Sequence, residues 1–452
     1  MQSESSVTVW AITSAIAGAF VIYRHWRRDR SVGLLLTYVL SFAALHWLAS
    51  ALRMLPWFVP RNGDLTLEGL QQSTYALIAF AIGTELAHHR PTRRAADEDP
   101  EWSPKSARLV RMYLVAGIGV YTLFLMAGRL PFVAAVVSTG STLVAVSVAL
   151  MIWVASTQGR VVNAWLWVAV TCLFPLVTVV TQGFLGYGFV AMLIVASFAA
   201  SMQRSRAKAA LAGMLLLYAG LSVYVTYMRD RSEIREVVWG GERVEARVDQ
   251  LQSTLINMEW FDPMQIDHLN RIEKRLNQNH LVGAAVVWLD EGNIEFAGGG
   301  TLFDAIVAVI PRALWPAKPT TAGSGDIVST YTGIDFAYGT SVGVGQVLEL
   351  YINFGTAGVV VGFVVIGALI ALVDRRSASY LAQGDIRNFT LWYMPGLSLL
   401  QIGGSLSEVT ATAAASWALV HVVSKFAGGN RLVDDPVAPR AAVVERQPEI
   451  AR

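Results

Sequence analysis

Charged residues are scarce in this chain, which is 15% charged and 54% hydrophobic. Ordinary soluble domains are about 25% charged, so the composition excludes that class and is typical of a membrane protein. Cysteine is scarcer still. Cys172 is the only one, so no intrachain disulfide can form, and its apolar surroundings disfavour a catalytic thiolate. The formal net charge of +2 gives no indication of nucleic acid or of an acidic partner.

Long apolar runs are what the sequence has in place of charge. Several windows of about 18 or more residues are long enough to cross about 30 Å of hydrocarbon as helices. They must be helical, because lipid offers no partner to an open backbone group. We therefore predict an all-α polytopic membrane protein with about 11 transmembrane helices. The expected spans are residues 7–23, 31–51, 68–87, 110–128, 137–155, 161–180, 184–202, 209–228, 346–373, 387–404 and 409–426.

Basic residues predict the orientation of these spans. If the N-terminus lies outside, inside segments such as RHWRRDR and QRSRAK hold most of the Lys and Arg of the short loops. The short outside loops hold only Arg53, Arg61 and Arg129, and this asymmetry is the one that the positive-inside rule uses. The first span has no basic residue before it, so we expect an uncleaved helix and not a signal peptide.

The predicted spans divide the chain into four regions. Residues 1–228 hold eight spans, residues 229–345 form one large outside segment, residues 346–428 hold three spans, and the tail 429–452 is expected to be disordered. An outside segment of that length must contain its own structure.

Apolar residues at helical spacing predict two amphipathic helices in the outside segment, over 244–255 and 266–276. We expect both to rest on the membrane domain or at its surface. Residues 301–310 are too few to cross the membrane, so they predict a half-inserted or surface helix that ends at Pro311.

Two arginines share one face of the second amphipathic helix. Arg271 and Arg275 are four residues apart, and like charges at this spacing repel. They therefore need an acidic neighbour or an anion. Asp267 can pair with Arg271 on the same helix, and a bound diphosphate is the functional alternative.

The stretch IPRALWPAKP, residues 310–319, adds two more cations. Its prolines stiffen the chain, which holds Arg312, Trp315 and Lys318 in fixed directions. Arginine forks bind phosphate oxygens in bidentate fashion, so these cations and the two arginines of the helix predict a diphosphate site. The outside segment has no cluster of metal ligands with the usual spacing, so no metal and no other cofactor is expected.

A stretch rich in Gly, Ser and Thr follows Pro319 and is expected to be a loop. It either adapts to a polar ligand, with Tyr331 and Tyr338 stacking on sugar rings, or serves as a mobile connection. The ninth span then opens with VLELYINFG, which places Glu349 and Tyr351 in its first turns. A carboxylate in a membrane helix is costly unless it faces a wet cavity or a cation, so Glu349 is a candidate functional residue.

The chain combines a many-span frame and one large late loop with three distinctive stretches, RLNQNH, IPRALWPAKP and GVGQVLELYINFGTAGVVVGF. In these features it resembles the Wzy-type polymerases of O-antigen and exopolysaccharide repeat units. That group also holds the O-antigen ligases, and the resemblance covers about residues 270–365. It implies a glycosyltransferase of the bacterial inner membrane with its active site facing the periplasm. A growing glycan on undecaprenyl diphosphate would be transferred to an incoming lipid-linked repeat unit, with a flippase and a chain-length regulator as protein partners.

The resemblance supports Arg312 and Arg275 as diphosphate ligands. The acceptor hydroxyl is a poor nucleophile, so a base is expected to assist its attack, which inverts the anomeric carbon. Glu349, His280 and Asp326 are the candidates for that base, and Glu349 is preferred.

Three alternatives stay open. A ligase uses the same donor and differs only in its final acceptor. A transporter would carry charged residues near the midplane on broken helices, whereas the ionisable residues here gather at one face and in one loop. A lipid-phosphate-sugar glycosyltransferase usually has paired acids in its first outside loop, where this chain has only Asp64 and Glu68.

Overall fold

The computed structural model describes residues 2–27, 31–59, 65–87, 104–127, 131–203, 205–310, 315, 317–318, 323–336 and 342–428. The predicted C-terminal tail and most of IPRALWPAKP, including Arg312, lie outside these residues.

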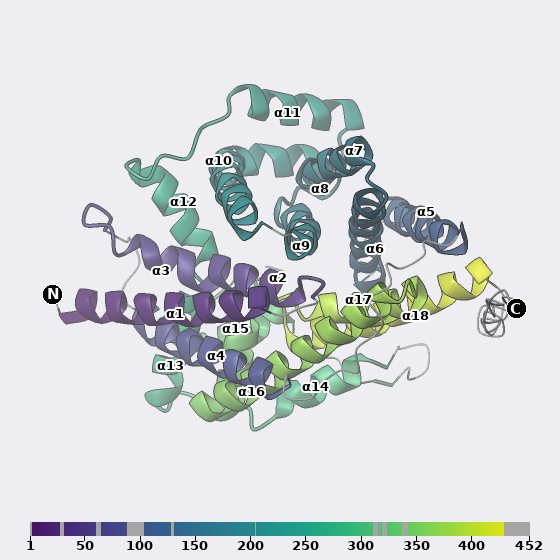
Figure 1. Cartoon of the computed structure of the whole chain (residues 1–452). Coiled ribbons are helices and arrows are strands. Elements are labelled where there is room, and N and C mark those ends of the chain that lie inside the picture. Colours follow the sequence, from purple (N-terminus) through teal and green to yellow (C-terminus); the bar gives the residue numbers. More distant parts are fainter. Residues whose placement is uncertain are drawn as a thin grey trace, which may run out of the picture.

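All regular structure in the described part of the chain is helical (Figure 1), so the all-α prediction is confirmed. The first helices in chain order are α1 (Gln2–Arg27), α2 (Leu34–Phe42), the π-helical turn η1 (Ala43–Trp47), α3 (Leu48–Leu52), α4 (Thr66–Leu86), α5 (Pro104–Ala127), α6 (Pro131–Thr157), α7 (Val161–Cys172), α8 (Phe174–Gln182), α9 (Gly186–Met202) and α10 (Arg206–Trp239). They are followed by α11 (Val244–Ile256), α12 (Ile266–Leu276), α13 (Gln278–Asp290), α14 (Gly300–Ala308), α15 (Ser324–Thr332), α16 (Gln346–Ala382), α17 (Ile386–Ser398) and α18 (Leu406–Gly428).

Seven segments among the described residues are long and apolar enough to cross a membrane, as a multi-pass membrane protein requires. They are Ser6–Arg27, Leu34–Leu52, Thr139–Thr157, Val162–Gln182, Arg206–Trp239, Gln346–Ala382 and Leu406–Ala427. The other four predicted spans coincide with α4, α5, α9 and α17, and their crossing of the membrane stays a prediction.

The predicted amphipathic helices of the outside segment are present as α11 and α12. Leu269 and Ile272 of α12 are fully buried and pack against Leu52 and Phe58, next to α3. In contrast, Val244 and Val248 of α11 are exposed. In Figure 1 α11 lies across the top of the view, beyond α10 and α8.

The prediction of a loop after Pro319 is wrong over Ser324–Thr332, because these residues form α15. Its start is stabilised by Asp326, whose Oδ2 accepts a hydrogen bond from the backbone N–H of Gly323 at 3.2 Å. Val328 is fully buried on its inner face. One cap and one buried side chain therefore outweigh a composition that favours a loop.

Glycine lets α4 approach both α13 and α16 at backbone contact. A Cβ on Gly283 would lie 1.6 Å from the carbonyl oxygen of Leu65, and a Cβ on Gly83 would lie 2.1 Å from that of Val364. Small residues at such crossings are how membrane helices pack closely. The α4–α16 contact holds the part of α16 around Val364, beyond Glu349, against the frame.

We expect Gly83→Val to destabilise the fold, because the added side chain must displace the α16 backbone. Overpacking of this kind costs about 1–3 kcal/mol or more. Thermal unfolding of purified protein in detergent should show a clearly lower Tm. Gly213→Val is the matched control, since Gly213 also lies in an apolar helix but has nothing within 4 Å of its added Cβ. Equal Tm values for the two variants would refute the close contact.

Candidate functional site

Glu349 lies in the first turn of α16 and is completely buried. Its Oε2 accepts a hydrogen bond from the backbone N–H of Leu406 at 2.6 Å, at the start of α18. Its Oε1 is also buried and accepts no well-formed hydrogen bond among the described residues, while the Thr301 side chain is a polar neighbour of the carboxyl. Because buried polar atoms are almost always paired, an unpaired carboxylate oxygen marks this position as a candidate functional site.

α16 is interrupted a little more than one turn after Glu349. Phe354 and Gly355 have non-helical backbone angles, and Gly355 has a φ of 61° with a ψ of −153°, a conformation open essentially to glycine. The preceding Asn353 fastens the break, since its Nδ2 donates to Thr301 Oγ1 at 2.7 Å and its Oδ1 accepts from the N–H of Gly299 at 2.9 Å. The start of α14 is thereby held beside Glu349, with Asp304 of α14 as a neighbouring acid.

The junction of α12 and α13 lies against the start of α16. A Cβ on Gly345 would meet Gln278 Oε1 at 2.4 Å, and a Cβ on Gly403 would meet Gln278 Nε2 at 3.0 Å. Because both positions are glycine, the Gln278 amide can reach the loop before α16, which holds Gly345, and the loop before α18, which holds Gly403. RLNQNH and GVGQVLELY, which are some 70 residues apart in sequence, therefore meet in space.

Arg271 pairs with an acidic neighbour, Glu259. Its Nη1 donates to Glu259 Oε2 at 2.6 Å and to the carbonyl oxygen of Val225 at 3.1 Å. Asp267, one of the two partners that the sequence left open, forms no ion pair with Arg271 within the described residues. Glu259 also accepts from Arg229 Nη1 at 2.9 Å and contacts His268 Nε2 at 3.1 Å. Arg271 is therefore part of a structural network between α10 and α12.

This network should make stability sensitive to acid. Partial burial opposes ionisation of Glu259, but the hydrogen bonds from Arg229, Arg271 and His268 outweigh it and lower its pKa from 4.5 to about 2. A carboxyl with a depressed folded pKa adds stability that is fully present above its unfolded pKa and is lost as the pH falls towards the folded one.

We therefore expect the Tm of the wild type to fall more steeply between about pH 5 and pH 2 than that of Glu259→Gln, which has no such carboxyl. Differential scanning fluorimetry in detergent measures this. Glu291→Gln, at an exposed position, should keep the steepness of the wild type. If the Tm of Glu259→Gln fell as steeply as that of the wild type, the network would not be the source of the acid sensitivity.

Arg275 has a different environment from Arg271. It is exposed, and within the described residues no acid forms an ion pair with it. Partial desolvation and the nearby Arg231 of α10 lower its pKa. Arg235, one turn further along α10, lies 4.5 Å from the ring centre of Phe184 and adds a third guanidinium to the group. Three guanidinium groups that have no acidic partner within the described residues favour a bound anion.

His280 lies in the first turn of α13, half-buried, and burial lowers its pKa despite the opposing effect of Glu273. Its Nδ1 is buried and has no hydrogen-bond partner among the described residues. The adjacent Asn279 contacts His46 Nδ1 through its Oδ1 at 2.8 Å and donates to Ser50 Oγ at 2.9 Å. These bonds fix the chain that presents His280.

The remaining cations and acids predicted for substrate binding are placed as follows. Arg312 lies outside the described residues. Lys318 Nζ donates to the carbonyl oxygens of Ala308 at 3.3 Å and Ile310 at 3.0 Å, beyond the last turn of α14. Asp326 caps α15, as described above.

Among the predicted aromatic contacts, Trp315 is exposed and remains available to a ligand. Tyr331 is half-buried and packs against the main core. Tyr351 is 5% exposed, with its ring centre 6.2 Å from that of Phe296, so its ring belongs to the core. Tyr338 lies outside the described residues.

Sequence reasoning missed Glu259, Arg231 and Arg235. The two arginines had a readable signal, because they stand four residues apart in RSEIR, the spacing that singled out Arg271 and Arg275. The predicted span ends at residue 228, whereas α10 continues to Trp239, so both arginines lie on a part of the helix that the prediction does not include.

Fold and site together define an all-α, multi-pass membrane protein with a buried, half-paired glutamate where a membrane helix begins. Residues 71–384 match the family described as a domain of unknown function, DUF8712, and the chain belongs to that family. The matched region runs from within α4 past the end of α16 and contains all of residues 229–345 and Glu349. No curated protein and no solved structure matches the chain.

Proposed function

We propose that this protein polymerises undecaprenyl-diphosphate-linked repeat units at the periplasmic face of the bacterial inner membrane. The observation that supports this most is Glu349, buried at the start of an apolar helix with one carboxylate oxygen that accepts no well-formed hydrogen bond among the described residues. Such an oxygen is suited to accept a proton from a sugar hydroxyl.

The proposed reaction is a single displacement. The acceptor hydroxyl attacks the anomeric carbon of the donor glycan, and Glu349 takes up the hydroxyl proton. The bond between that carbon and the diphosphate oxygen breaks with inversion, and undecaprenyl diphosphate leaves. Diphosphate is already a good leaving group, so cationic stabilisation is the main help it needs.

Arginine side chains supply that stabilisation in the proposal, without a metal. Three arginines lack acidic partners within the described residues, namely Arg275, Arg231 and Arg235. Arg312 is added as a fourth diphosphate ligand only because the resemblance implies it. The α12–α13 junction connects Arg275 to the loop that precedes Glu349 through Gln278. Acid-paired Arg271 is assigned to structure in this account.

A lipid-linked glycan transporter is the second candidate, and the break in α16 favours it. Transporters often place their substrate sites at interrupted membrane helices, and Gln346–Asn353 before the break is buried and rich in polar groups. A ligase is a third possibility that shares the donor chemistry.

The length distribution of surface polysaccharide separates the three functions. A deletion strain and its complemented form are compared on a glycan-stained gel, with extraction of the lipid carrier. Collapse of the ladder to one repeat unit supports the polymerase. Long polymer retained on the carrier would instead indicate a ligase. Single lipid-linked units that exogenous glycosidase cannot reach in spheroplasts would indicate a transporter.

A further inference from the structure

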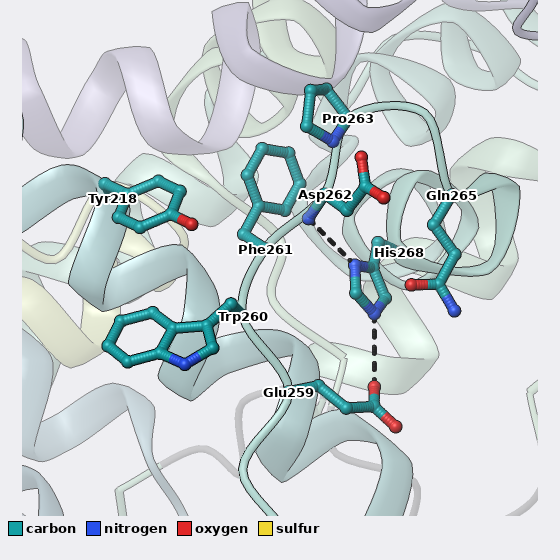
Figure 2. A pocket seen from close by; sticks show the side chains of 8 residues that line it. All are labelled: Tyr218, Glu259, Trp260, Phe261, Asp262, Pro263, Gln265 and His268. Carbon is teal, nitrogen blue, oxygen red and sulfur yellow. Dashed lines mark hydrogen bonds and ion pairs between the residues drawn. The ribbon is translucent and has the colours of Figure 1, made fainter.

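A pocket lies between α10 and the segment 257–265, which connects α11 to α12 (Figure 2). The segment runs back along α10. Arg229 Nη1 donates to the carbonyl oxygen of Asn257 at 2.8 Å, and the N–H of Phe261 donates to Ser222 Oγ at 3.0 Å. These bonds lead the segment down to Tyr218 and leave a pocket of about 640 Å³. The pocket is wide open, so a ligand would lie against its walls and would not be enclosed by them.

One side of the pocket is aromatic. The rings of Tyr218 and Trp260 are nearly parallel, at 9°, with centres 6.0 Å apart. They are 46% and 61% exposed, so much of their surface is available. The face of an aromatic ring is electron-rich and attracts the C–H groups on the apolar face of a sugar ring.

The other side is polar and firmly built. His268 is 1% exposed, accepts from the N–H of Asp262 at 3.1 Å and contacts Glu259 at 3.1 Å, so it fixes the polar wall (Figure 2). Asp262 is exposed and uses Oδ1 for the N–H of Met264 at 2.9 Å. Its Oδ2 and the exposed Gln265 amide have no hydrogen-bond partner within the described residues.

Charge decides which ligand fits. Glu259 is engaged with two arginines and His268, so Asp262 is left as the carboxylate that a ligand meets. A carboxylate repels phosphate and accepts hydrogen bonds from hydroxyls. Aromatic faces opposite a carboxylate and an amide therefore suit an uncharged ligand that carries many hydroxyls.

The pocket also adjoins the lipid-facing surface. Tyr218 lies in the apolar part of α10, where Leu215 and Leu217 are 63% and 57% exposed. A sugar attached to a lipid can reach it from the bilayer, whereas a free sugar would arrive from water.

We propose that this pocket is a saccharide-binding site that holds the sugar portion of a lipid-linked glycan, with Tyr218 and Trp260 against the ring faces and Asp262 and Gln265 on the hydroxyls. The identification of that glycan as the repeat unit rests on the proposed function, while saccharide binding does not.

The test uses the purified full-length protein in detergent and isothermal titration calorimetry. The probes are the repeat-unit oligosaccharide released by mild acid from the carrier lipid of the source strain, and the same unit still on its carrier. Loss of one ring contact or of the carboxylate should weaken binding of the free oligosaccharide about tenfold or more in Trp260→Ala and in Asp262→Asn. Trp165→Ala is the control, since Trp165 is 68% exposed on α7.

Binding of the released oligosaccharide that is weakened in both pocket variants and unchanged in Trp165→Ala supports the site. Tighter binding of the carrier-linked form by the same protein would show that the lipid contributes. No binding of either probe by the wild type, or equal affinity in Asp262→Asn and the wild type, would overturn it. Asp262→Asn changes an exposed side chain, so it keeps the test decisive if Trp260→Ala fails to fold.

The outcomes separate this inference from the proposed function. If the wild type binds the oligosaccharide but transfers none, the saccharide-binding site is supported and the polymerase function is refuted. If transfer proceeds and both pocket variants bind the released oligosaccharide as tightly as the wild type, the polymerase function is supported and the pocket is refuted.

Discussion

Glu349→Gln is expected to abolish chain extension and leave the protein folded. The amide can still accept the hydrogen bond from the N–H of Leu406, so the local structure is retained, but it cannot take up a proton. General bases contribute about 10²–10⁴-fold to rate, so the ladder of surface polysaccharide should shrink to a single repeat unit. The gel comparison and the Tm in detergent are measured on the same variants.

A structural role for Glu349 predicts the opposite pattern. A neutral amide is less costly to bury than a carboxylate with a free oxygen, so Glu349→Gln would then give a normal ladder and an unchanged or higher Tm. Glu408→Gln is the matched control, because Glu408 is a neighbouring acid on α18 but is exposed. It should keep the ladder, and loss of extension in both variants would point to a general need for acidic residues here.

Arg275→Ala and Arg271→Ala should have opposite consequences. Arg275 has no acidic partner within the described residues and lies near Arg231, so its loss should leave the Tm unchanged or raise it. If it binds diphosphate, one charge-assisted bond worth roughly 1.5–3 kcal/mol is lost, which lowers kcat/KM for the lipid-linked donor about 10–150-fold.

Arg271→Ala removes the 2.6 Å contact to Glu259 and the bond to Val225. The Tm should fall, while kcat/KM per folded protein changes much less. Initial rates at several donor concentrations, with thermal unfolding of both variants, measure the contrast. If Arg275→Ala were the unstable variant and Arg271→Ala the inactive one, the assignment of the two arginines would have to be exchanged.

Much of the fold followed from hydropathy and helical spacing. The apolar runs gave the all-α class, and Leu269 and Ile272 gave the buried face of α12. These features depend on local sequence, which a single chain displays. α15 was missed because its composition favours a loop, and its stability comes from a cap and from tertiary burial of Val328.

The candidate site was less accessible from sequence. The cost of burying Glu349 in a membrane helix singled it out without any structure. The partner of Arg271 could not be found in this way, because Glu259 is 12 residues away and reaches it only through the course of segment 257–265 along α10. Nor does sequence spacing show that Gln278 meets Gly345 and Gly403, since that contact depends on three helices packing together.

Reconstitution tests the central claim most directly. Purified protein in liposomes is supplied with a single undecaprenyl-diphosphate-linked repeat unit in the presence of EDTA, and the products are analysed by mass spectrometry and NMR. The account predicts glycans of two and more repeat units on the carrier, joined through an inverted anomeric centre, and almost none with Glu349→Gln. Unextended substrate with the wild type, or equal extension by Glu349→Gln, would contradict it.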